Sequence, residues 1–129
     1  MAWVDTAAAA CAMRHCGVSV VTASIDALHF VAPVPMGWVV CLDASVNFTA
    51  RTSCEIGVRV TAFHPITGEL RHTATAYLTF VGLDATGKPT PIPPVKPETA
   101  KDRERFAAGE IRRRGRLELK ERLLKNSTP

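Results

Sequence analysis

Hydrophobic and polar positions alternate with a period of two in four stretches of the chain, which is typical of β-strands. The four stretches are residues 20–30, 39–48, 53–63 and 72–83. In the third stretch Ile56, Val58 and Val60 share one face. In the first stretch, the same alternation places Thr22 and Ser24 together on one face. Turn residues at 33–37, 49–53 and 65–69 separate the consecutive stretches, so we predict an antiparallel meander of all four strands.

An alanine-rich segment at residues 3–16 precedes the predicted strands, and Gly17 follows it. Alanine is the best helix former and glycine commonly caps a helix end, so we predict a helix here. Because alanine side chains are short, a sheet can approach the axis of such a helix closely. One helix followed by antiparallel strands indicates an α+β fold.

Five prolines interrupt residues 84–97, and a charged helix is expected from about residue 98 to 125. Proline cannot donate to a strand ladder, so this segment should lead the chain out of the sheet. We therefore predict a domain over residues 1–95 and a charged C-terminal helix or tail over residues 96–129. Phe106, Ile111, Leu117, Leu123 and Leu124 are the residues by which the helix could dock.

The chain of 129 residues has a net charge of +4, and residues 96–125 hold eleven basic and six acidic residues. Acidic and basic residues alternate there at helical spacing, as at Glu110 and Arg114, which is typical of a solvated helix. A role in binding an anionic small molecule or a phosphate is the alternative, and we expect no nucleic-acid partner. The longest weakly polar run, residues 7–13, is far shorter than the roughly 20 residues of a membrane span. We expect no membrane partner either.

Four cysteines occur without a CxxC pair, and none of the four histidines has metal-ligand spacing. The sequence predicts no metal site. Reduced thiols that pack as small hydrophobic groups are typical of a cytoplasmic protein.

Several phrases occur in an order that resembles a known family. They are WVD at 3–5, VVTASIDALHF at 20–30, RTS at 51–53 and AYLTFVGLDATGKPTPIP at 76–93. Over residues 1–95 the chain resembles the hotdog-fold acyl-CoA thioesterases, of the cytosolic acyl-CoA hydrolase type. The resemblance implies a hotdog fold, in which a curved antiparallel sheet wraps a long central alanine-rich helix.

The resemblance also implies a thioester hydrolase that converts acyl-CoA to free fatty acid and CoA without a cofactor. Two subunits of this family pair through the strand that corresponds to residues 20–30. The expected assembly is a homodimer or a trimer of dimers, with active sites at the dimer interface.

Asp5 lies in the first turn of the predicted helix. From the residues alone, this carboxylate either caps the helix or serves as a catalytic base beside free backbone N–H groups. The match of WVD to the family's carboxylate position favours the catalytic role, in which Asp5 activates water.

Five further residues match substrate-binding positions of the family. Thr22 and Ser24 correspond to strand positions that bind the pantetheine arm of CoA, although plain polarity at a subunit edge is an alternative. Arg51, Thr52 and Ser53 correspond to a turn near the CoA phosphates, for which a guanidinium and hydroxyl groups are suited. A polar hairpin turn is the alternative, and Ala50 stands where the family has glycine.

The family has a first strand and a loop with Asn and Gly-Gly before the helix, and this sequence does not contain them. We expect either a late start of the recorded chain or a shortened relative. A catalytically weak or inactive acyl-CoA-binding subunit is therefore the alternative function. A hotdog dehydratase or hydratase is disfavoured, because no His and acid match the positions that such chemistry uses.

Overall fold

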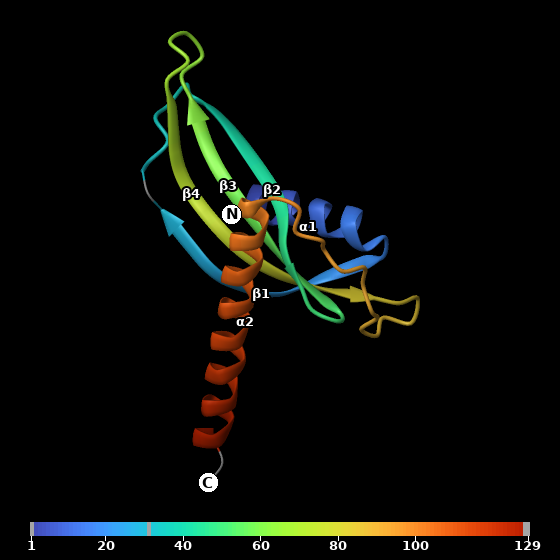
Figure 1. The fold of residues 1–129 in the computed structure, drawn as a ribbon. Coiled ribbons are helices and arrows are strands. Elements are labelled where there is room, and N and C mark those ends of the chain that lie inside the picture. The colour runs from blue at the N-terminus through green and yellow to red at the C-terminus, as the bar shows by residue number, and fades with distance from the viewer. Residues whose placement is uncertain (1, 31, 128–129) are drawn as a thin grey trace.

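An antiparallel four-stranded sheet lies between two helices in the computed structural model (Figure 1). The structure describes the backbone of residues 2–30 and 32–127, and the side chains of residues 3–25 and 32–125. The elements follow the order α1 (Ala2–Cys16), β1 (Ser19–Phe30), β2 (Val39–Thr49), β3 (Ser53–Phe63), β4 (Leu70–Leu83) and α2 (Ala100–Ser127). Among these described residues, neither helix is long and apolar enough to cross a membrane.

The strand order in the sheet is β1-β4-β3-β2, with every neighbouring pair antiparallel. The meander predicted from the sequence is therefore correct for β2, β3 and β4 and wrong for β1. The chain crosses one end of the sheet after β1, and β1 pairs with β4 instead of β2. Alternation within a strand records its two faces but not its neighbour. β1 and β2 are consequently the two edge strands.

The hydrophobic core lies between α1 and the inner face of the sheet. Ala8 and Ala12 are fully buried there, together with Ile56, Val58 and Leu78. Branched strand residues fill the volume that the small alanine side chains leave, so helix and sheet pack closely. This confirms the predicted thin core helix, and the combination of sheet and helix confirms the α+β class.

Helix α2 packs on the opposite, outer face of the sheet (Figure 1). The Phe106 ring lies edge-on to Phe48, with 4.9 Å between the ring centroids. Of the five residues that the sequence offered for docking, only Phe106 does so. Ile111 is 65% exposed, and the three leucines Leu117, Leu123 and Leu124 are exposed as well. Polar residues instead hold the middle of the helix on the sheet.

An extended segment connects β4 to α2 and crosses one end of the sheet. Ile92 donates its backbone N–H to the Arg51 carbonyl at 3.0 Å, and its buried side chain packs in the core. The Val95 N–H donates to Thr49 Oγ1 at 3.0 Å, and His15 Nε2 lies 2.7 Å from the Pro93 carbonyl oxygen. The proline-rich segment is thus tied to the sheet and to the end of α1.

Two glycines of α2 offer a matched test of its docking. A Cβ at Gly109 would lie 2.7 Å from the Phe48 Cβ, whereas a Cβ at Gly115 would meet nothing within 4 Å. We expect Gly109→Ala to lower the free energy of unfolding by about 1–3 kcal/mol because of the clash. Gly115→Ala should raise it by up to about 1 kcal/mol, since alanine favours helix. Urea denaturation measures both, and a Gly109→Ala chain as stable as the wild type would contradict this packing.

Candidate functional site

The carboxylate of Asp5 lies beside the edge strand β1, where Thr22 Oγ1 donates a hydrogen bond to Asp5 Oδ1 at 3.3 Å. Asp5 belongs to the first turn of α1, in which the backbone N–H groups have no partner within the helix. Both side chains are exposed in the single chain. The structure therefore brings together a carboxylate, a hydroxyl and a helix N-terminus at one open edge of the sheet.

A register shift in the pairing of β1 with β4 lies between Thr22 and Ser24. Thr22 pairs with Phe80 on β4, but Ser24 pairs with Thr79, so an extra residue lies between them. Phe80 is on the inner face with the core, whereas the Thr79 hydroxyl on the outer face accepts a hydrogen bond from Arg116. The expectation that Thr22 and Ser24 share one face is thus wrong, because a β-bulge shifts the alternation. By register, only Thr22 lies on the face of Asp5.

The turn of Arg51, Thr52 and Ser53 joins β2 to β3 and is fixed by backbone hydrogen bonds. The Ala50 N–H donates to the Ser53 carbonyl at 2.8 Å, and the carbonyls of Thr52 and Arg51 accept from Gly82 and Ile92. These bonds occupy the backbone, while the Arg51 side chain is exposed.

The same turn lies at the end of the sheet that carries Thr22. Ser53 and Val21 both pair with Val81, so they belong to one row across three strands. Two strand spacings separate Ser53 from Val21 by about 10 Å. The Arg51–Ser53 turn and the Asp5–Thr22 pair are therefore neighbouring features that one extended ligand could reach together.

Three cysteines lie between α1 and the start of β3. Burial raises the pKa of the Cys54 thiol to about 12, and the neighbouring thiols Cys16 and Cys11 add to this increase. Burial also raises the pKa of Cys16 and Cys11. These thiols are thus protonated at neutral pH and pack as small hydrophobic groups, as predicted. Because only a thiolate is an effective nucleophile, they are not suited to nucleophilic catalysis.

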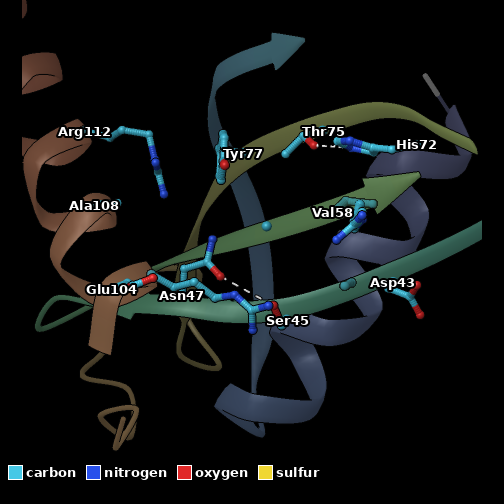
Figure 2. A pocket seen from close by; sticks show the side chains of 14 residues that line it. Asp43, Ser45, Asn47, Val58, His72, Thr75, Tyr77, Glu104, Ala108 and Arg112 are labelled. Atoms are coloured by element: carbon cyan, nitrogen blue, oxygen red, sulfur yellow. Dashed lines mark hydrogen bonds between the residues drawn. The ribbon is translucent and has the colours of Figure 1, made fainter. Parts of the chain in front are cut away.

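A groove of about 670 Å³ lies on the outer face of the sheet, beside α2 (Figure 2). Its polar lining residues are Asp43, Ser45, Asn47, Arg59, His72, Thr75, Tyr77, Glu104, Arg105 and Arg112. Carboxylates and guanidinium groups mix along it, so the groove suits a polar surface or ligand and not a hydrocarbon chain. It is on the opposite face from Asp5, and none of its polar lining residues is a site residue expected from the sequence.

A buried ion pair closes one side of this groove. Glu55 on β3 is almost fully buried and accepts hydrogen bonds from Arg112 Nε, at 3.0 Å from Oε2, and from Asn47 Nδ2, at 3.3 Å from Oε1. The Arg112 guanidinium carbon lies 3.7 Å from the centre of the Tyr77 ring, toward which it points in Figure 2. Arg112 thus joins α2 to β3 and β4, and its charge is already balanced by Glu55.

Comparison with known proteins places this architecture in a family. Residues 1–69 match the thioesterase superfamily, to which the chain belongs. The fold is the hotdog fold of acyl-CoA thioesterases. A crystal structure of an apo-hexameric acyl-CoA thioesterase matches with a TM-score of 0.87 and 38% identity, over 91% of this chain and 75% of that one.

Further relatives carry related names. The acyl-CoA hydrolase of Staphylococcus aureus, solved with butyryl coenzyme A, coenzyme A and coenzyme A disulfide, is 33% identical with a TM-score of 0.85, over 99% of this chain and 80% of that one. The uncharacterized acyl-CoA thioester hydrolase YkhA of Bacillus subtilis is 42% identical over 79% of this chain, and the cytosolic acyl coenzyme A thioester hydrolase of Rattus norvegicus is 36% identical over 87%. The chain spans 59% of the length of the first and 30% of the second.

Proposed function

We propose that this chain hydrolyses acyl-CoA thioesters to free acid and CoA, with Asp5 as the group that activates water. The observation that carries the proposal is the position of Asp5, in the first turn of α1 and within hydrogen-bond distance of Thr22 on an open strand edge. The names of the relatives support the substrate class. The rat relative's description as cytosolic supports a cytoplasmic location.

The chemistry requires a base and an oxyanion site. Asp5 accepts a proton from a water molecule whose oxygen attacks the thioester carbonyl carbon. The Thr22 hydroxyl holds the carboxylate in place, and N–H groups at the start of α1 are suited to stabilise the negative charge that develops on the carbonyl oxygen. The carbon–sulfur bond then breaks, and the CoA sulfur takes up the proton.

The site is open on one side in the single chain, because Asp5 and Thr22 are exposed beside the edge strand β1. A second copy paired at β1 would close it, which supports an active site at the interface of a homodimer. The hexameric relative is consistent with a trimer of dimers.

We propose that Arg51, Thr52 and Ser53 hold the CoA phosphates. A contact of Ser24 with the pantetheine arm would require the arm to reach the other face of β1.

The direct test is the release of CoA thiol from acyl-CoA substrates of increasing chain length, followed with a thiol-reactive dye. We expect saturable thiol release that is proportional to the concentration of the chain. Binding of acyl-CoA by calorimetry without thiol release would instead establish the alternative, an inactive acyl-CoA-binding subunit. A chain that neither binds nor hydrolyses acyl-CoA would contradict the proposal as a whole.

A further inference from the structure

Helix α2 crosses the strands of the sheet one after another. Phe106 contacts Phe48 on β2, Arg112 bonds to Glu55 on β3, and Arg116 Nη1 donates to Thr79 Oγ1 on β4 at 2.8 Å. From residue 106 to residue 116 the helix advances about 15 Å, while two strand spacings amount to about 10 Å. The helix therefore runs obliquely across the outer face toward β1.

The helix does not end where the sheet ends. From Arg116, which lies over β4, the chain continues as helix to Ser127. The residues up to Lys125 add about 14 Å, which is enough to pass over β1 and reach about one strand position beyond its free edge. Figure 1 shows α2 running past β1 and projecting from the sheet.

The face of α2 that packs on the sheet continues into this projecting half. Gly109, Arg116 and Leu123 follow one another at seven-residue steps and so lie on one side of the helix. Gly109 is buried against the sheet, whereas Leu123 and Leu124 are each 60% exposed. With Leu119 they line a shallow apolar groove beside Arg116 and Lys120. The docking face thus changes from polar to leucine-rich where the sheet ends.

An apolar side chain is also exposed at the sheet edge below the projecting half. Val21 is 47% exposed on the edge strand β1, and it pairs with Val81, so by register it lies on the outer face. An edge strand offers its outer backbone groups to another strand. A strand added at β1 would extend the sheet to the place that Leu123 and Leu124 reach.

We propose that the projecting half of α2 is an arm that docks on the outer surface of a second copy of this chain, joined at β1, and buries Leu119, Leu123 and Leu124 there. The proposal rests on the pairing through β1 under the proposed function. Position supports a second copy as the partner, because a strand added at β1 by a second copy would extend the sheet beneath the arm. The residues beyond Arg116, 117–125, hold three basic and two acidic residues, so the arm is nearly neutral and its exposed leucines would make the contact.

The test is the association of the whole chain with Leu123→Glu, measured by sedimentation velocity over a dilution series. We expect the dissociation constant to rise at least about tenfold, because a carboxylate replaces a buried leucine. Ile111→Glu is the matched control. It adds the same charge to the same helix, but Ile111 is 65% exposed and lies on the side away from the sheet, two residues from Gly109. It should leave association unchanged.

Three outcomes would contradict the proposal that the projecting half of α2 docks on a second copy. They are a wild-type chain that is monomeric throughout, Leu123→Glu that associates as the wild type does, and Leu123→Glu that weakens only binding to vesicles of anionic phospholipid. The last outcome would identify a membrane surface as the partner. Because the readout is association, a chain that failed to hydrolyse acyl-CoA could still show the predicted difference between the two variants.

Discussion

Replacing Asp5 with Asn is expected to lower kcat for acyl-CoA hydrolysis by at least about a hundredfold, the usual contribution of a general base. Asparagine has the size of aspartate, and its carbonyl oxygen can still accept the hydrogen bond from Thr22, which Asp5 accepts at 3.3 Å. It cannot take a proton from water. The KM for acyl-CoA should change much less than kcat, since the carboxylate acts on water and not on the CoA moiety.

Steady-state kinetics of thiol release measure this effect, and circular dichroism verifies the fold. The matched control is Asp43→Asn, which removes an exposed carboxylate from the outer face of β2 and should keep wild-type kcat. Thr22→Ser retains the hydroxyl and should stay near the wild type, whereas Thr22→Val removes the hydrogen bond to Asp5. An Asp5→Asn chain with more than a third of wild-type kcat would eliminate Asp5 as the base.

The elements of the fold follow from local patterns in the sequence. The predicted strand at 53–63 agrees with β3 at both ends, and the helix predicted at 3–16 differs from α1 by one residue. Period-two alternation and alanine content are local properties, so they locate elements well. The pairing of β1 with β4 depends on the path of the chain across the sheet end, which local alternation does not encode.

The candidate site was only partly predictable for the same reason. Asp5 and Thr22 were identified through the family resemblance, and the structure adds the hydrogen bond between them. The register shift between Thr22 and Ser24 was not visible in the sequence. A bulge adds one residue without leaving a turn residue in this strand. Alternation that looks regular along β1 therefore assigned Ser24 to the wrong face.

The residues by which α2 docks on the sheet could not be predicted from the sequence, because most of them are charged. The sequence predicts that the arginine run with Arg112 and Arg116 belongs to a solvated helix and that leucines face the sheet. In the structure, Glu55 lies on the outer face of β3, whose inner residues are apolar. Arg112 donates a hydrogen bond to Glu55 on this outer face. Hydrophobic periodicity gives no weight to such a pair. A buried acid on one element and an arginine far along the chain can be matched only in three dimensions.

Replacing Arg112 with Met should lower the free energy of unfolding by about 3–5 kcal/mol, the range for breaking a buried ion pair by removing one partner. The Glu55 side chain is only 4% exposed, so its carboxylate would remain buried and would keep the hydrogen bond from Asn47 Nδ2 at 3.3 Å. Glu55→Gln should lower the free energy of unfolding by less than Arg112→Met does, because it leaves no buried unpaired charge. Arg112 is 24% exposed and keeps its contact with the Tyr77 ring, so its charge can still reach water.

Urea denaturation of both single variants and of the double variant Glu55→Gln/Arg112→Met forms a double-mutant cycle. The double variant should be more stable than Arg112→Met alone, because it no longer buries an unpaired carboxylate. Arg114→Met is the surface control: its pair with Glu110, at 3.4 Å, is between two exposed side chains and should contribute less than about 1 kcal/mol. Equal losses for Arg112→Met and Arg114→Met would show that α2 is not held by the buried pair. The direction in which α2 projects past β1 would then need another cause than the contact of Arg112 with Glu55.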